Sequence, residues 1–333
     1  MRIALFGFLV AVTVSGCGGS TAKKVCLVTA GPAQDGSYNQ IVYDGVTKAA
    51  AAAKWTMATT EVMDGQETAA FASLGKGGCE LIIEPGFPLA DSIAMLATDH
   101  PTQKIQILDF DFDPPFANVW SENYASDQAS FLAGYLAAAV SKTGKVGVFG
   151  GLQIPPVTLF MDGFALGVAY YNQQKSKQVL VLGWDVASQM GTFIDDFGDE
   201  QKGQDAATGL LDNGADIVFP VAGGAGFGAI PAVKAHAGSL VIGVDADWAL
   251  ESPGDAAVIL TSVLKRLDVS VDKAIRATDM GQFAGGPHVG GLADDSVQLA
   301  PFHAQEANVP AAVQTELTQL RTAILGGTVK TQP

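Results

Sequence analysis

The chain has 333 residues, of which 39 are glycine and 48% are hydrophobic, and its formal net charge is −15. Such an acidic balance, without a cluster of Lys or Arg, argues against binding nucleic acid through neutralised phosphates. The length exceeds that of one ordinary domain and, at roughly 150 residues per domain, predicts two lobes.

The first 17 residues have the pattern of an export signal. Met1 and Arg2 form a short basic start, residues 3–14 are an apolar run too short to span a bilayer, and small residues lead to Cys17. This ending resembles a bacterial lipobox, which implies cleavage before Cys17 and lipidation of its thiol. We therefore expect a lipid anchor on the outer side of the cell membrane, with residues 18–24 as a tether. A plain signal peptide in which Cys17 has no role is the alternative.

Short apolar runs alternate with helical patterns after the tether. Residues 25–30 are continuously apolar, as in a parallel strand buried on both faces, and residues 41–53 have helical spacing. The series continues with a strand at 57–63, a helix at 68–74, a strand at 80–83, a helix at 89–98 and a strand at 105–109. This order predicts one doubly wound α/β lobe.

The loop at residues 31–40 connects the first strand to its helix. In open α/β sheets ligands bind beyond the carboxyl ends of the strands, where a helix N-terminus offers unpaired N–H groups. Asp35 and Asn39 can exchange hydrogen bonds with a ligand, and the ring of Tyr38 offers a stacking face. The loop therefore predicts a binding site for a ring that bears polar groups.

A second series of similar elements follows. The predicted elements are helix 127–141, strand 146–149, helix 157–171, strand 179–183, helix 201–212, strand 217–220, helix 228–236 and strand 240–244. Two such lobes in tandem would face each other across a cleft, and chain crossings between them would form a hinge. The expected lobes are 25–122 plus about 257–282, and 123–256 plus about 283–330.

Cys26 and Cys79 lie near the starts of two strands that are expected to be neighbours. An exported protein can keep a disulfide, but a register offset of two or three residues would put the Cα atoms out of bridging range. The sequence leaves both possibilities open. No Cys or His group has the spacing of a metal site, and we expect neither a metal nor a cofactor.

Several segments resemble, in colinear order, the basic membrane protein (BMP) family. They lie at residues 24–30, 35–40, 131–138, 144–151, 154–155, 163–167, 214–219 and 242–247. The family consists of substrate-binding lipoproteins of ABC importers, similar to the purine nucleoside receptor A type. The resemblance implies a class I periplasmic-binding-protein fold that closes on a nucleoside, acts as a monomer and delivers its ligand to an ABC permease.

The resemblance also implies which residues stack on the base. Tyr38 stands where the family usually has a Phe, and Asn39 matches the Asn that follows it. Phe197 matches the aromatic residue that would cover the other face of the base, with Phe193 as the alternative.

Polar ligand residues follow in the same way. Asp109 matches the family's Asp at the end of the fourth strand, Asp245 matches the Asp of its Gly-Val-Asp motif, and Lys265 would face the cleft beside Asp245. Two hydroxyls of a ribose suit an ionised carboxylate at a strand end. Trp248 stands where the family has Gln, which is a departure from its pattern.

The glycine-rich loop at residues 222–228 follows a strand and precedes a helix, but it has neither the dinucleotide spacing nor a following Lys-Ser/Thr. We expect Gly223 and Gly224 to let the backbone approach the ligand and donate N–H groups to it.

No nucleophile elbow or metal-spaced His/Cys group is present in the sequence, so we expect a binding protein rather than an enzyme. The main alternative is a binding protein for another ligand, such as a sugar or a signalling molecule. A nucleoside hydrolase using the pair Asp195 and Asp196 is the enzymatic alternative. A surface adhesin would be expected to carry a repeat or a low-complexity stalk, and the sequence has neither.

Overall fold

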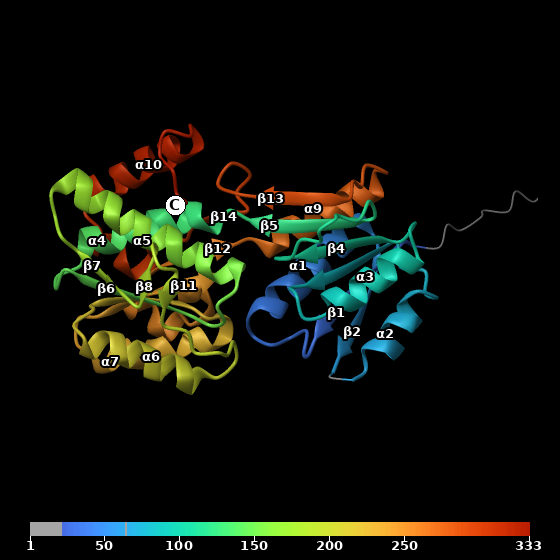
Figure 1. Cartoon of the computed structure of the whole chain (residues 1–333), viewed down its shortest axis with the longest axis horizontal. Helices are drawn as coiled ribbons and strands as arrows, with labels where there is room; N and C mark the ends of the chain where they lie inside the picture. Colours follow the sequence, from blue (N-terminus) through green and yellow to red (C-terminus); the bar gives the residue numbers. More distant parts are fainter. Residues whose placement is uncertain (1–21, 64) are drawn as a thin grey trace, which may run out of the picture.

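The computed structural model describes residues 22–63 and 65–333, so Cys17 and most of the expected tether lie outside the described residues. Two α/β lobes lie side by side, each built on a six-stranded sheet (Figure 1). The doubly wound lobes predicted from the sequence are confirmed. Among the described residues, no helix has both the length and the apolar character needed to cross a bilayer.

The first lobe contains a parallel sheet in the order β13-β5-β4-β3-β1-β2. Its strands are β1 (Lys24–Ala30), β2 (Thr56–Val62), β3 (Leu81–Pro85), β4 (Lys104–Leu108), β5 (Val119–Tyr124) and β13 (Gly286–Gly290). One face is covered by α1 (Tyr38–Ala53) and α9 (Leu267–Asp279), and the other by α2 (Glu67–Leu74) and α3 (Ala90–Asp99). Both faces are buried, which explains the continuous apolar runs of β1 and β3.

The second lobe contains a sheet in the order β14-β12-β11-β10-β6-β7, parallel except for β14. Its strands are β6 (Lys145–Gly150), β7 (Leu180–Leu182), β10 (Ile217–Val221), β11 (Leu240–Asp245), β12 (Ile259–Lys265) and β14 (Val297–Leu299). In Figure 1 one face carries α4 (Ser126–Val140), α5 (Pro155–Lys175) and α10 (Ala311–Leu325), and the other carries α6 (Glu200–Asp212) and α7 (Ala229–Ala235). Smaller elements are β8 (Trp184–Asp185), β9 (Met190–Gly191), α8 (Trp248–Glu251) and the 3-10 helices η1 (Gly223–Gly228), η2 (Pro253–Val258) and η3 (His303–Asn308).

The late elements are divided between the lobes differently from the sequence-based boundaries. The expected first lobe included residues 257–282, but β12 pairs with β11 and so belongs to the second sheet. Conversely β13, expected in the second lobe, pairs with β5 in the first sheet. The chain therefore crosses between the lobes after β5, after β12 and after β13, because strand partners and not chain order decide the sheet.

Cys26 and Cys79 form a disulfide, with their Cα atoms 5.8 Å apart. Cys26 lies opposite Ile82 in the strand register, three residues beyond Cys79. The chain bends at Glu80, between Cys79 and the start of β3 at Leu81, so the regular strand register does not extend to Cys79. This bend accounts for a bridge between two residues whose register alone would separate them.

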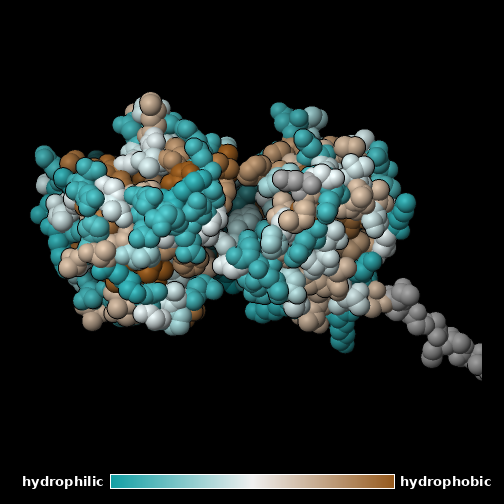
Figure 2. All heavy atoms as spheres, turned by 90° about the horizontal axis from the view of Figure 1, so that it is seen from below, coloured by the Kyte–Doolittle hydropathy of each residue, from teal (hydrophilic) through white to brown (hydrophobic). Residues whose placement is uncertain are grey.

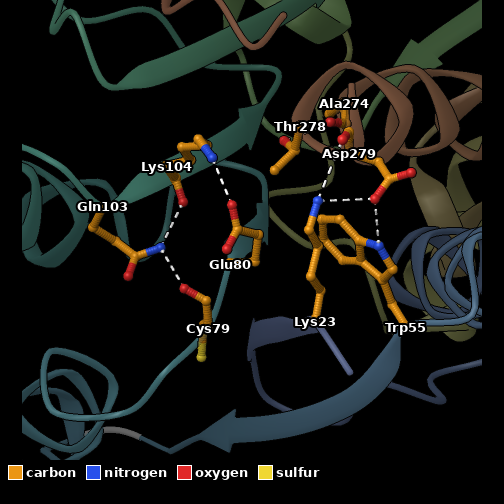
Figure 3. Close-up of polar contacts among 9 residues, drawn as sticks. All are labelled: Lys23, Trp55, Cys79, Glu80, Gln103, Lys104, Ala274, Thr278 and Asp279. Carbon is orange, nitrogen blue, oxygen red and sulfur yellow. Dashed lines mark hydrogen bonds and ion pairs between the residues drawn. The ribbon is translucent and has the colours of Figure 1, made fainter. Parts of the chain in front are cut away.

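The start of the described chain is fixed at the edge of the first sheet that is opposite the carboxyl strand ends. Lys23 Nζ donates a hydrogen bond to Asp279 Oδ1 at 3.0 Å and lies over the ring of Trp55, whose Nε1 donates to the same oxygen at 3.1 Å (Figure 3). At the same edge Lys104 pairs with Glu80 at 2.7 Å. The described chain therefore begins at the edge of the first sheet away from the carboxyl strand ends.

Candidate ligand-binding cleft

A cavity of about 470 Å³ is lined by residues of both lobes. Figure 2 shows, on one face of the molecule, the indentation that separates the lobes. The residues that line the cavity lie at or just after the carboxyl ends of β1, β3 and β4 in the first lobe and of β10, β11 and β12 in the second. Residues from the first turns of α5 complete the lining. The size falls within the range of small-molecule pockets. All nine residues singled out from the sequence as ligand contacts line this cavity, namely Asp35, Tyr38, Asn39, Asp109, Phe197, Gly223, Gly224, Asp245 and Lys265.

Asp35 and Asn39 organise the loop before α1. Asp35 Oδ1 accepts hydrogen bonds from the N–H groups of Ser37 (2.9 Å) and Gln40 (3.0 Å), and its Oδ2 accepts from the N–H of Asn39 (3.3 Å). Asn39 Nδ2 donates to the carbonyl of Pro32 at 3.0 Å. The Asp35 carboxylate thereby satisfies N–H groups in the first turn of α1, which would otherwise lack partners, while the Asn39 amide ties the helix to the loop before it.

Tyr38 lines the cavity, and its hydroxyl is fixed by a hydrogen bond to another residue of the first lobe. Its Oη donates a hydrogen bond to Asp109 Oδ2 at 2.7 Å. Burial, followed by the nearby Asp109 carboxylate, raises the pKa of Tyr38 well above its usual value. The hydroxyl is therefore a neutral donor, and this bond fixes the orientation of the ring.

Lys265 is almost completely buried at the end of β12. Its side chain is 4% exposed, and its Nζ donates to Asp109 Oδ2 at 2.7 Å. The ammonium also lies 5.0 Å, 5.5 Å and 5.7 Å from the ring centroids of Phe160, Tyr124 and Tyr38. The sequence placed Lys265 beside Asp245, but its hydrogen-bonded partner is Asp109.

Asp245 ends β11 and faces the cavity from the second lobe. Among the described residues, none donates a hydrogen bond to its carboxylate. Burial raises the pKa of Asp245 to about 6, with Lys265 acting to lower it and Asp109 to raise it further. Asp245 is thus a half-buried carboxylate that can accept hydrogen bonds from a ligand.

Of the two candidate aromatic residues before α6, only Phe197 lines the cavity. Phe193 packs edge-on against Trp184, with ring centroids 5.8 Å apart. The carbonyl of Phe197 accepts a hydrogen bond from the N–H of Ala225 at 2.8 Å, which ties it to η1. The structure therefore favours Phe197 over Phe193 as a ligand-facing ring.

Gly224 lines the cavity between Phe197 of its own lobe and Ser37 of the first lobe. A Cβ atom built on it would lie 3.3 Å from the carbonyl oxygen of Phe197 and 3.6 Å from Cβ of Ser37 in the first lobe. A Cβ atom there would thus be in ordinary contact with Ser37, and its tightest neighbour would be the Phe197 carbonyl oxygen of the same lobe.

Several apolar residues that line the cavity were not predicted from the sequence. Phe87, Phe160 and Phe227 line the cavity, and Phe227 stacks on Trp248 with ring centroids 4.3 Å apart. Trp248 is buried and donates from Nε1 to the carbonyl of Val244 at 3.0 Å. The spacing of apolar residues in the sequence cannot distinguish residues that line a cavity from residues of the core. The only signal for these lining residues in the sequence was Trp248, which stands where the family has Gln.

Known proteins resemble this chain along most of its length. Residues 22–330 match the family model described as ABC transporter substrate-binding protein PnrA-like. Basic membrane protein A of Borreliella burgdorferi is 30% identical over 270 residues, which cover 80% of this chain and 75% of that protein. ABC transporter nucleoside-binding protein BmpA of Lactococcus lactis is 28% identical over 232 residues, which cover 66% of this chain and 62% of that protein.

A solved ABC transporter solute-binding protein from Aeropyrum pernix K1 is similar in structure, with a TM-score of 0.81 over 92% of both chains at 24% identity. This likeness confirms the two-lobed binding-protein fold.

Proposed function

The chain belongs to the Bmp family of PnrA-like ABC transporter substrate-binding proteins, and we propose that its cleft captures nucleosides, purine nucleosides above all, for an ABC permease. The protein would act as a lipid-anchored monomer on the outer side of the membrane, held through Cys17. The name of the Lactococcus lactis relative, a nucleoside-binding protein, agrees with this ligand class.

The observation that carries the proposal is the composition of the cavity wall. Tyr38 from the first lobe and Phe197 from the second offer aromatic faces, and Asp245 offers a carboxylate without a partner among the described residues. A base can stack on these rings, with about 1–3 kcal/mol gained per stacked base in single-strand binders. The ribose hydroxyls can donate to Asp245, because charge-assisted hydrogen bonds are the stronger kind.

The alternatives fit this wall less well. A sugar or another ligand without an aromatic ring would leave Tyr38 and Phe197 without a stacking partner. For a hydrolase, Asp196 would have to act on the ligand, but it does not line the cavity. Its carboxylate instead accepts hydrogen bonds from the N–H groups of Gly198 and Asp199 and pairs with Lys202.

Calorimetric titration of the purified, unrefolded protein with guanosine, inosine, adenosine and guanine tests the ligand class, with myo-inositol and glucose as controls. We expect the nucleosides to bind and the controls not to bind. Mass spectrometry of ligands that co-purify provides an independent identification. Binding of the controls alone, or release of free base during incubation, would contradict the proposal.

Anchoring is tested separately by fractionating cells that express Cys17→Ser. If Cys17 carries the lipid, this variant moves from the membrane fraction to soluble or uncleaved forms. Unchanged fractionation would leave the proposed anchor without support.

A further inference from the structure

One carboxylate oxygen connects the two lobes at the base of the cavity. Asp109 Oδ2 accepts a hydrogen bond from Tyr38 Oη and another from Lys265 Nζ, each at 2.7 Å. Asp109 and Tyr38 belong to the first lobe, whereas Lys265 ends β12 of the second sheet, where the chain crosses to α9. The orientation of the Tyr38 ring is therefore linked to the crossing strand.

The buried ammonium of Lys265 has two carboxylates near it. It is hydrogen-bonded to Asp109, and its charge acts to lower the pKa of Asp245. A buried charge without a partner is costly, so Lys265 must pair with one of them. If Asp109 lost its charge, Asp245 would be the remaining carboxylate for the ammonium to approach.

We propose that Asp109 is a positioning residue: it holds Lys265 and Tyr38 through one oxygen and so leaves the carboxylate of Asp245 available to the ligand. The role of Asp109 is then indirect, in contrast to the direct ligand contact expected from the sequence. Only the identity of the ligand in this inference rests on the proposed function; the side-chain arrangement does not.

The first test needs no ligand. NMR titration of ¹³C-carboxyl-labelled Asp residues follows Asp245, whose signal is assigned by its loss in Asp245→Asn. The charged groups that shift its pKa are Lys265 on β12 and Asp109 after β4, whereas Tyr38 on α1 stays neutral because its own pKa is raised. In the wild type we expect a pKa of about 6. In Asp109→Asn we expect a lower pKa, because a neighbouring negative charge is removed and Lys265 approaches Asp245.

Asp111→Asn is the matched control, since Asp111 lies in the same loop, is exposed and does not line the cavity. It should leave the Asp245 titration unchanged, as should Tyr38→Phe, which removes no charge. An unchanged Asp245 titration in a folded Asp109→Asn variant would overturn the inference. If that variant does not fold, Lys265→Met supplies the second test: the Asp245 pKa should rise above its wild-type value, and an unchanged pKa would overturn the electrostatic arrangement.

The second test uses guanosine and guanine as probes. Asp109→Asn should weaken guanosine at least tenfold and guanine less, because Asp245 is then engaged by Lys265, and Asp109→Glu should restore part of the affinity. Loss of guanosine binding with an unchanged Asp245 pKa would assign Asp109 a direct contact and contradict the positioning role. If the wild type binds no nucleoside, the proposed function fails, while the ligand-free titration still decides the inference.

Discussion

Asp109 and Asp245 occupy matching positions in the two sheets. Asp109 follows β4 and Asp245 ends β11, each strand being the fourth in its sheet when counted from β2 or β7. Both residues have a left-handed backbone, with φ of 57° and 66°. This conformation is uncommon outside glycine but is tolerated best by Asn and Asp. The repeated lobe architecture therefore brings two carboxylates to one cavity from opposite sides.

The aromatic pair before α6 provides a matched experiment on stacking. Phe197→Ala should weaken purine nucleosides by about 1–3 kcal/mol, roughly ten- to a hundredfold, because it removes a ring from the cavity wall. Phe193→Ala should instead lower the melting temperature and leave affinity nearly unchanged, since its ring packs on Trp184. Calorimetry and melting curves on both variants measure this, and equal losses of affinity would exclude Phe197 as the specific stacking residue.

Tyr38→Ala and Asp245→Asn separate recognition of the base from recognition of the sugar. Tyr38→Ala should weaken guanosine and guanine alike by about 1–3 kcal/mol, because both carry the ring. Asp245→Asn should weaken guanosine more than guanine, which has no ribose hydroxyls to donate. Titrations of both ligands against both variants give the comparison, and a parallel loss for Asp245→Asn would place the contact elsewhere.

The raised pKa of Asp245 predicts a pH dependence of stability. Its folded pKa of about 6 exceeds the ordinary value of 3.8, so the folded state binds the proton more tightly. The resulting stabilisation is fully present below pH 3.8 and is lost as pH rises through about 6. Relative to Asp245→Asn, the wild type should therefore lose on the order of 1–3 kcal/mol of unfolding free energy across this interval. Urea unfolding at both ends of the range measures it, and a constant difference between the proteins would contradict the assignment.

Ionisation of the same carboxylate should also govern affinity. Nucleoside binding should weaken as pH falls below about 6, because protonated Asp245 no longer offers a charged acceptor. This loss of affinity at low pH should be absent in Asp245→Asn, which provides the control. Calorimetry from about pH 5 to about pH 8, a range that includes the expected midpoint of about 6, would reveal it.

The Cys26–Cys79 bond closes a loop with a sequence separation of 53 residues. Its loss should lower the unfolding free energy by about 2–4 kcal/mol, mainly because the unfolded chain gains freedom. Urea unfolding of Cys26→Ser with Cys79→Ser, compared with the oxidised wild type, measures the change. If reduction of the wild type leaves its unfolding midpoint unaltered, the bond contributes no stability.

Crossings after β5, β12 and β13 predict that the lobes close on ligand by bending at these segments. Small-angle scattering with saturating nucleoside should then give a smaller radius of gyration than without it. Bound ligand should also raise the melting temperature by mass action. A raised melting temperature without compaction would favour a cleft that is closed before binding.

The sequence alone determined the repeated strand-helix order and the positions of the loops at the carboxyl strand edge. These features depend on local periodicity and on the rule that parallel strands present their carboxyl ends together. For this reason the loop that carries Asp35, Tyr38 and Asn39 could be predicted as a ligand site from the sequence pattern. Family resemblance added Asp109, Phe197, Asp245 and Lys265, which periodicity could not distinguish from other residues of the same types.

Only the tertiary structure decided which partners these residues take. The sheet membership of β12 and β13, the Cys26–Cys79 bond and the pairing of Lys265 with Asp109 rather than Asp245 all join segments far apart in the chain. Such pairings depend on strand register, turns and side-chain packing, in which differences of a few ångströms change the partner. Local sequence patterns constrain each element, but they do not constrain the distances between elements, and those distances settle the electrostatics of the cleft.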